Sequence, residues 1–348
     1  MKHMKLKAGY LGGAFALTLA AGSAQAQDLT VVNWGGPFTD AFRTALYDPF
    51  TAETGIKVVE DTWNGGVGTL RAQVEGGASS WDVIEVEAEE LRQGCEEGLF
   101  EELDWDAIGV REDFLPDWSN ECGVGTILAS WGLAWDGSKQ TVAPTSWADF
   151  FDLEKFPGKR GFRKGPKHVL EFALLADGVA PADVYTVLAT DEGVDRAFAK
   201  LDTIKDQTVF WEGSSTPAQL LASGDVVMTM FPSGRLSGAN ASGQDIRYLW
   251  EGSQFYGDAW VILKGSKNVE AATKFLAKWA TPETGAEFMK IYDYGVSNTK
   301  SAALVDPARI SVLPSAPENL KGAIPLDPDF WVENGDALNA RFQEWAMQ

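Results

Sequence analysis

Residues 29–34 read LTVVNW, a short β-branched run, and a helical stretch follows it. The same alternation continues to residue 98. The next runs are IKVVEDTW (56–63) and WDVIEVE (81–87), and the helical stretches are FTDAFRTALYDPFTAETG (38–55), TLRAQVEGG (69–77) and AEELRQGCEEG (88–98). Short strands that alternate with helices predict a parallel sheet built from βαβ units, and therefore an α/β fold.

Three side chains lie where these predicted strands end. Trp34 follows the first run, and Glu85 and Glu87 close the third. Ligands bind open α/β sheets beyond the carboxyl ends of the strands, so these residues are expected near a binding edge. Paired acids also serve glycosidases, although two acids at this spacing are typical of a polar strand end. The acid runs at 87–90 and 101–106 are interpreted as solvated faces.

A second domain follows the stretch GTILASWGLAWDG (125–137). The composition shifts there to turn residues, and strands and helices alternate again as far as VVMTMF (226–231). The chain is also longer than one hydrophobic core usually supports, so two domains are expected.

The N-terminus has the pattern of a secretory signal peptide. Lys2, Lys5 and Lys7 precede an apolar stretch, and a small-residue cleavage pattern ends at Ala26, so residues 1–26 are expected to be removed. Such a signal fits a Gram-negative periplasm. No other segment approaches the apolar length of a membrane span of about 20 residues.

The charge of the chain is strongly negative. Loss of three Lys and no acids with the signal peptide would move the formal charge from −21 to −24. This charge argues against nucleic acid and anionic membranes as partners. The negative electrostatic field of the protein favours cationic ligands, but a high negative charge can equally serve solubility in general.

The cysteines and histidines argue against zinc chemistry. Cys95 and Cys122 are the only cysteines, and in an oxidising compartment one disulfide is expected. His168 is the single histidine after the signal peptide, so a zinc site is improbable. No cofactor is predicted: the Gly-rich segments GGVGT (65–69) and GVGT (123–126) lack the spacing of nucleotide-binding loops. The sequence contains no recognisable motif for a catalytic nucleophile, so no enzyme activity is predicted.

The segment FYGDAWVILKG (255–265) places one acid, Asp258, among aromatic residues. Asp258 either caps the start of a strand, or it pairs with an ammonium group that aromatic faces cover. The chain also contains 14 Trp, several of them at predicted strand ends or in loops, which together suggest a binding cleft. These are Trp34, Trp63, Trp211, Trp250, Trp260 and Trp331.

At this point the chain resembles the periplasmic solute-binding proteins of ABC importers, specifically the spermidine/putrescine-binding group, over nearly its whole mature length. The more specific matches are the tryptophan after the first strand and the aromatic-x-Asp pattern, whereas ETGIKV and TSWADF are shared by related solute-binding groups. The matching segments include VVNWGGPF (31–38), WDVIEV (81–86), PTSWADFFDLEKFPGKRGF (144–162), ASGDVVMTMFPSGR (222–235), FYGDAWVILKG (255–265) and YGVSN (294–298).

The resemblance implies a type II periplasmic-binding-protein fold with the ligand in an interdomain cleft. The N-terminal lobe would comprise residues 27–137 and 258–302, and the C-terminal lobe residues 138–257 and 303–348. The chain would cross between the lobes near 137, 257 and 302. The resemblance also implies a monomer that delivers its ligand to an inner-membrane ABC permease.

Family binding residues carry over onto several positions. Trp34 resembles the ring that covers a polyamine chain, Tyr256 and Asp258 the pair that holds an amino group, and Tyr294 a tyrosine that closes the cleft. Phe231 stands where the family often has Trp. The remaining candidate ligand contacts are Glu85, Glu87, His168, Arg235 and Trp331.

The sequence departs from the polyamine pattern near residue 168. Polyamine binders carry acids there, whereas this chain reads RGFRKGPKHVLEF (160–172), with Arg160, Arg163, Lys164 and Lys167 beside His168. These residues, with Arg235, form either an anion site at a helix N-terminus or a solvated basic surface.

Three functions remain open. A polyamine-binding protein is the leading hypothesis, and a binding protein for an ω-amino acid such as γ-aminobutyrate is the alternative. A secreted carbohydrate-active enzyme is the alternative from another class.

Overall fold

The computed structural model describes Met1 and residues 28–77 and 79–347. Residues 2–26 of the predicted signal peptide lie outside these residues. In the described part of the chain, ten strands form one sheet. They are β1 (Leu29–Asn33), β2 (Val58–Thr62), β3 (Val83–Glu87), β4 (Gly123–Asp136), β5 (Arg160–Arg163), β6 (Thr208–Trp211), β7 (Met228–Pro232), β8 (Ile246–Ile262), β9 (Gly295–Val296) and β10 (Ile324–Pro325).

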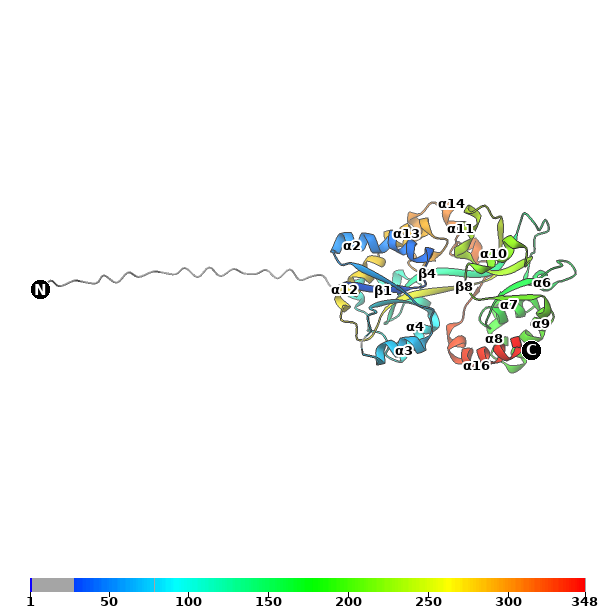
Figure 1. The fold of residues 1–348 in the computed structure, drawn as a ribbon, viewed down its shortest axis with the longest axis horizontal. Coiled ribbons are helices and arrows are strands. Elements are labelled where there is room, and N and C mark those ends of the chain that lie inside the picture. Colours follow the sequence, from blue (N-terminus) through cyan, green and yellow to red (C-terminus); the bar gives the residue numbers. More distant parts are fainter. Residues whose placement is uncertain (2–27, 78, 348) are drawn as a thin grey trace.

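Helices cover this sheet in two groups, one in each half of the molecule (Figure 1). The α-helices are α1 (Pro37–Phe42), α2 (Asp48–Thr54), α3 (Val67–Glu75), α4 (Ala88–Glu96), α5 (Trp105–Ile108), α6 (Trp147–Phe151), α7 (Val169–Ala176), α8 (Val184–Leu188), α9 (Asp191–Asp202), α10 (Thr216–Ser223), α11 (Leu236–Ala241), α12 (Val269–Trp279), α13 (Pro282–Ile291), α14 (Pro307–Ile310), α15 (Pro317–Leu320) and α16 (Pro328–Met347). None of the described helices is long and apolar enough to cross a membrane.

The strand order is β2-β1-β3-β8-β4-β7-β5-β6, and it confirms the predicted α/β class. The β1 strand pairs in parallel with β2 and β3, as the βαβ pattern predicts, and β5 pairs in parallel with β6 and β7. The central pairs β3/β8, β8/β4 and β4/β7 are antiparallel, so the sheet is mixed rather than wholly parallel. The sequence runs of the first three strands correspond to β1, β2 and β3.

Two large hydrophobic clusters define two lobes. The cluster of the first lobe contains Val31 of β1, Val83 of β3 and Phe275 of α12, all fully or almost fully buried. The cluster of the second lobe contains Phe162 of β5 and Phe172 of α7. Because helices cover both faces of the sheet, β4 is an almost continuous apolar run rather than an alternating one.

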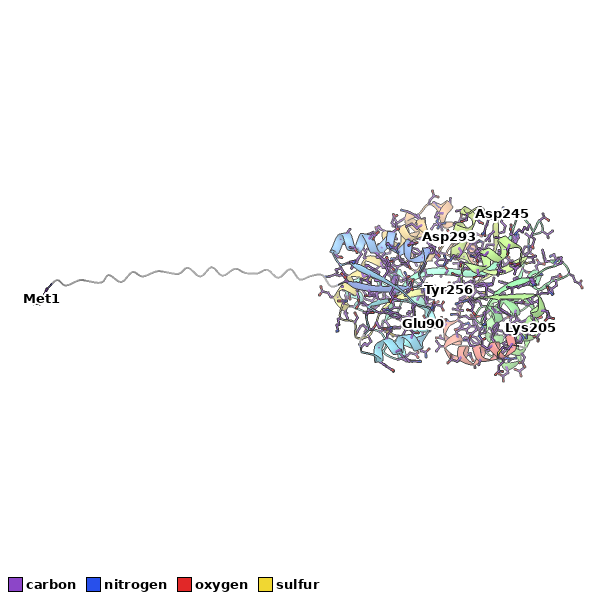
Figure 2. The ribbon with its side chains drawn as sticks, in the orientation of Figure 1. Met1, Glu90, Lys205, Asp245, Tyr256 and Asp293 are labelled. Carbon is purple, nitrogen blue, oxygen red and sulfur yellow. A yellow bond between two sulfur atoms is a disulfide. The ribbon has the colours of Figure 1, made fainter. Side chains whose placement is uncertain are left out.

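The long strands β4 and β8 belong to both lobes. In β4, Ala129 packs in the first cluster and Trp131 in the second, so the chain crosses earlier than the predicted position near 137. In β8, Tyr256 contacts both clusters, and it lies between the lobes (Figure 2). Leu313 still belongs to the first cluster and Ile324 to the second, so the last crossing is later than the predicted one near 302.

The C-terminal segment contains more helix than its Pro and Asp content indicates. It ends in α16, whose Trp331, Phe342 and Trp345 pack in the core of the second lobe. Pro328 is tolerated because it occupies the first turn, where its missing N–H has no helical partner. This helix is absent from the elements that the sequence predicts.

A disulfide joins Cys95 and Cys122, as predicted, with 5.8 Å between their Cα atoms. It ties the end of α4 to the residue before β4. The closed segment includes α5 and two short turns of 3₁₀-helix that lie between them in the chain.

Candidate functional site

A cleft of about 960 Å³ opens between the two lobes, where β4 and β8 cross from one to the other. Its volume is at the upper end of the range for small-molecule sites, roughly 300–1,000 Å³. Side chains from both lobes line it. They include Trp34, Trp63, Glu87, Glu89, Glu90 and Asp258 from the first lobe, and Trp131, Arg163, Lys164, Lys167, Arg235 and Trp331 from the second.

Asp258 lies on β8 beside the end of β3, because the antiparallel register pairs it with Glu87. Its Oδ2 atom accepts a hydrogen bond of 2.8 Å from Nε1 of Trp34, the residue that follows β1. Its Oδ1 atom is buried and has no hydrogen-bond partner among the described residues. A buried acceptor without a donor is costly, so this oxygen marks a place where a ligand N–H group can bind.

The electrostatic surroundings of Asp258 favour a cationic ligand. Burial raises the pKa of Asp258 well above its usual value, and the nearby Glu85 and Glu87 raise it further, whereas the Trp34 hydrogen bond lowers it. An ammonium group at Oδ1 would offset this repulsion and return the carboxyl to its charged form.

Aromatic rings surround the same position. The rings of Trp34 and Trp63 are stacked, with centroids 5.3 Å apart and planes inclined by 17°. Tyr256 and Tyr294 also line the cleft, and both pack against the core of the first lobe. A carboxylate next to stacked indoles and phenols is a suitable environment for an ammonium group, which pairs with the charge and contacts the π faces.

Three further acids line the first-lobe wall, and they correct the expectation that residues 87–90 form a solvated face. Glu90 is only 6% exposed. Its Oε2 accepts a hydrogen bond of 3.0 Å from the Glu87 backbone N–H, and its Oε1 accepts one from Gly66. Burial, with the charges of Glu87 and Glu89, raises the pKa of Glu90 to about 8. The capping box formed by Glu87 and Glu90 at the start of α4 explains why both acids turn inward.

The second-lobe wall carries guanidinium groups. Arg163 ends β5 and lies over the Trp131 ring, 5.6 Å from its centroid. Arg235 follows β7, and its Nη2 donates to Ser214 Oγ at 3.0 Å. Within the described chain, neither arginine has an acidic side chain at ion-pair distance. Two guanidinium groups that face the cleft in this way are suited to bind a carboxylate.

Arg235 is held close to the aromatic side of the site. The preceding Gly234 lies against Tyr294, so that a Cβ atom there would be 2.5 Å from a ring carbon of Tyr294. Only glycine permits this approach of the second-lobe loop to a first-lobe ring. The contact places the start of Arg235 beside the tyrosines that neighbour Asp258.

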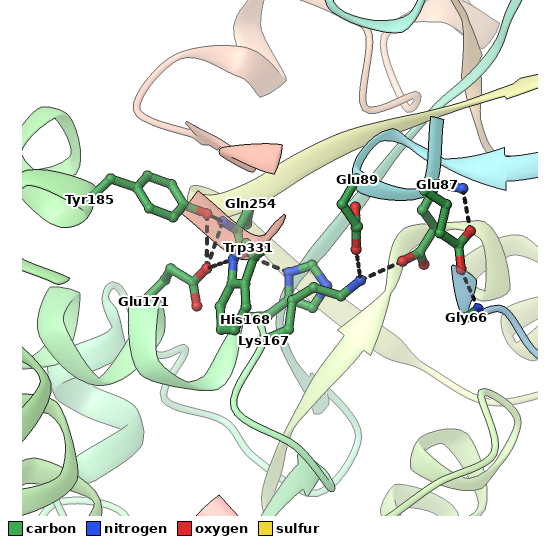
Figure 3. Close-up of polar contacts among 10 residues, drawn as sticks. Gly66, Glu87, Glu89, Lys167, His168, Glu171, Tyr185, Gln254 and Trp331 are labelled. Atoms are coloured by element: carbon green, nitrogen blue, oxygen red, sulfur yellow. Dashed lines mark hydrogen bonds and ion pairs between the residues drawn. The ribbon is translucent and has the colours of Figure 1, made fainter. Parts of the chain in front are cut away.

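Lys167 connects the two walls. It belongs to the segment between β5 and α7, and its Nζ forms ion pairs with Glu87 Oε2 and Glu89 Oε1 of the other lobe (Figure 3). Burial opposes ionisation of Glu87, but Lys167 and Arg163 outweigh it and lower the pKa of Glu87 to about 2. In the same way, the two glutamates outweigh burial and raise the pKa of Lys167.

A buried hydrogen-bond network lies behind this lysine (Figure 3). His168 Nδ1 is 2.6 Å from Gln254 Oε1, and Gln254 Nε2 donates to the Tyr185 hydroxyl at 2.7 Å. Glu171 Oε1 accepts from the Tyr185 hydroxyl and from Nε1 of Trp331, each at 2.9 Å. Burial, followed by the charge of Lys167, lowers the pKa of His168 to about 3, so the ring is neutral.

Several predicted contacts do not line the cleft. Glu85 is fully buried and accepts a hydrogen bond of 2.8 Å from Thr126. Phe231 is fully buried in a small cluster with Leu221 and Ile246, because its side chain points to the opposite face of β7. His168 is only 2% exposed and serves the network instead.

The basic segment at 160–168 divides in a similar way. Arg160 is fully buried, and its guanidinium donates to the carbonyl oxygens of Phe150, Asp152, Phe156 and Gly158. It therefore supports the second-lobe core and does not contribute to an anion site. Lys164 is exposed at the rim, 3.4 Å from Glu212.

The predicted tryptophans also separate into two groups. Trp34, Trp63 and Trp331 line the cleft, whereas Trp211 and Trp260 are core residues. Trp250 packs edge-on against Tyr248. The sequence analysis did not single out Trp131, Glu89 or Glu90 as ligand contacts. The spacing of Glu87 and Glu90, which is that of a capping box, is the signal that could have identified Glu90.

The cleft can thus hold a molecule with an ammonium group at one end and a carboxylate at the other. Among residues 28–77 and 79–347, His, Cys, Asp and Glu side chains form no cluster suited to a metal ion. The physical pattern is an acidic, aromatic wall that faces a basic wall.

Comparison with known proteins places the chain in a family. The model for bacterial extracellular solute-binding proteins matches residues 45–317. A γ-aminobutyric acid-binding protein of Pseudomonas aeruginosa is 44% identical over 99% of this chain and 97% of its own length. The spermidine/putrescine-binding periplasmic protein of Escherichia coli is 24% identical over 87% of this chain and 88% of its own length.

Solved structures show the same fold. A γ-aminobutyrate (GABA) receptor, Atu4243, superimposes with a TM-score of 0.83 at 34% identity, covering 92% of this chain and 97% of that one. The binding protein MotA of Agrobacterium tumefaciens B6, in complex with glucopine, gives a TM-score of 0.84 at 30% identity, covering 92% and 99%. These likenesses support the two-lobed architecture with the cleft between the lobes.

Proposed function

Because this chain belongs to the family of bacterial extracellular solute-binding proteins, which serve ABC transporters, we propose that its ligand is a small zwitterionic amine of the γ-aminobutyrate kind. The protein captures this ligand in the periplasm and delivers it to a membrane permease. Family membership also disfavours the alternative of a secreted carbohydrate-active enzyme, since the relatives are binding proteins.

One observation carries the choice of ligand: the two walls of the cleft have opposite charge. Asp258 lies next to Trp34 and presents a buried carboxylate oxygen that has no hydrogen-bond partner among the described residues. Arg163 and Arg235 line the facing wall. An ω-amino acid would place its ammonium group at Asp258 and its carboxylate at the arginines, where a planar guanidinium can form two parallel N–H bonds.

A polyamine, the leading hypothesis of the sequence analysis, is the weaker one. Its second ammonium group would have to lie against the basic wall, and like charges at close range in a partly buried site repel strongly. The relatives support the same order, since the γ-aminobutyric acid-binding protein is 44% identical and the E. coli spermidine/putrescine-binding protein is 24% identical.

Substitutions of Arg235 test the proposed ligand class. We expect calorimetric titration of the wild-type protein to show binding of γ-aminobutyrate and much weaker binding of putrescine. Arg235→Ala and Arg235→Lys should each weaken γ-aminobutyrate binding by about tenfold or more, since about 1.4 kcal/mol corresponds to a factor of ten. Lys is included because an ammonium group cannot reproduce the bidentate geometry.

A matched control is Arg341→Ala, which removes an exposed guanidinium that pairs with Asp195 in the second lobe. It should leave both affinities unchanged. Tight putrescine binding by the wild type, together with no detectable binding of any ω-amino acid, would contradict the proposal.

A further inference from the structure

The acidic wall of the cleft contains a site for a second cation, and the chain fills it. Glu87 and Glu89 flank the junction of β3 and α4, and both side chains line the cleft. Lys167 reaches them from the second lobe and forms an ion pair with each (Figure 3). The three side chains are all less than a quarter exposed.

The charges in this group do not balance. One ammonium group faces two carboxylates, and Glu89 Oε2 is buried without a hydrogen-bond partner in the described part of the chain. If Lys167 were removed, both partly buried acids would lose their ion-pair partner, and Arg163 would remain as a nearby positive charge for Glu87. Loss of the partner of a buried ion pair is strongly unfavourable. The two acids would then favour any cation that could enter the cleft.

We propose that Lys167 is a tethered counter-ion: it occupies the acidic pair that the second ammonium group of a diamine would otherwise bind, and so makes the cleft selective for ligands with one ammonium group. This inference rests on the proposed function, because it assumes that the first ammonium group binds at Asp258. It identifies Lys167 as a specificity-determining residue that need not contact the ligand.

Lys167 is well placed to compete with a free diamine. A group held on a short segment has an effective concentration on the order of millimolar or more at its own site. A diamine in solution must therefore exceed this concentration, or gain other contacts, to displace the lysine.

The segment that carries Lys167 is also fixed. The next residue, His168, has a φ of 70°, an unusual conformation for a residue other than glycine. The bond of His168 to Gln254 connects it to Glu171, Tyr185 and Trp331. A buried hydrogen-bond network of this kind restricts alternative positions of the backbone, and so keeps the ammonium group directed at the glutamates.

The test compares putrescine and γ-aminobutyrate affinities, measured by calorimetry, in the wild type and in Lys167→Met. Met keeps most of the side-chain length and removes the charge. We expect the ratio of putrescine affinity to γ-aminobutyrate affinity to rise at least tenfold. The control Lys278→Met removes an ammonium group from a first-lobe ion pair with Glu53 on α2 and should leave the ratio unchanged.

A second variant destabilises the fold less than Lys167→Met does, because it leaves fewer buried charges unpaired. In Lys167→Met/Glu89→Gln, one carboxylate remains for one incoming ammonium group, and only one buried charge is unpaired. The same rise in the ratio is expected. If either folded variant, verified by circular dichroism, retains the wild-type ratio, the inference is wrong.

This outcome is distinguishable from failure of the proposed function. If wild-type protein binds no ω-amino acid, the proposed function fails. If wild-type protein binds γ-aminobutyrate and the Lys167 variants keep the wild-type ratio of putrescine affinity to γ-aminobutyrate affinity, only the role of Lys167 fails.

Discussion

Replacement of Asp258 by Asn tests the centre of the site with a small change. The Asn side chain has nearly the same shape, and its oxygen can still accept the 2.8 Å hydrogen bond from Trp34. What is lost is the negative charge at a buried position that faces the cleft. The variant therefore separates pairing with a ligand from support of the fold.

The expected loss of affinity follows from the contact that is removed. A hydrogen bond between two charged groups contributes about 1.5–3 kcal/mol, so Asp258→Asn should weaken γ-aminobutyrate binding by about tenfold to about 150-fold. The effect on the ligand-free protein has the opposite sign. Because burial and neighbouring acids raise the pKa of Asp258, its ionised form destabilises the fold above the unfolded-state pKa. The ligand-free variant should be as stable as the wild type or more stable.

Calorimetric titration gives the affinity, and thermal unfolding without ligand gives the stability. Asp245→Asn is a matched control, because Asp245 is a partly exposed second-lobe acid that pairs with Arg247 away from the cleft. A variant with unchanged affinity and a markedly lower unfolding temperature would refute the reasoning. In that case Asp258 would be a structural cap at the strand, the simpler of the two interpretations of its sequence.

Two further predictions concern pH and the disulfide. Since the pKa of Glu90 is raised to about 8, the ligand-free protein should lose stability as pH rises from about 4.5 to 8, and Glu90→Gln should reduce this slope in thermal unfolding measured across that range. A wild-type slope that Glu90→Gln leaves intact would contradict the assignment. Reduction of the Cys95–Cys122 disulfide should lower the free energy of unfolding by about 2–4 kcal/mol in urea titrations, whereas an unchanged midpoint would show that the cross-link does not restrict the unfolded chain.

The first-lobe strands were predictable because their sequence carries local information. The β-branched runs that became β1, β2 and β3 are bounded by helices with clear ends, such as α2, which stops at Gly55 with a φ of 73°. The α16 helix was missed because its first residues, Pro328 and Asp329, resemble turn residues. Its stability comes from packing of Trp331 and Phe342 in a core assembled from distant segments.

The candidate site was less accessible to sequence reasoning. The hydrogen bond between Trp34 and Asp258 joins residues 224 positions apart. The resemblance to a family assigned both residues to the ligand site but did not predict this contact. Composition alone could not distinguish Arg160, buried among carbonyl oxygens, from Arg163, which faces the cleft. Adjacent residues of a strand point to opposite faces, but register decides which face is buried, and register depends on the whole sheet.

The sharing of β4 and β8 between the lobes has a consequence for how the chain folds during synthesis. On a ribosome the chain emerges from its N-terminus, yet β3 needs β8 as its neighbour. The paired residues Val83 and Ile262 are separated along the chain by α4, α5, β4 and all of the second-lobe strands β5 to β7. The first lobe therefore cannot complete its part of the sheet until β8 has been synthesised. Contacts this distant along the chain also slow folding.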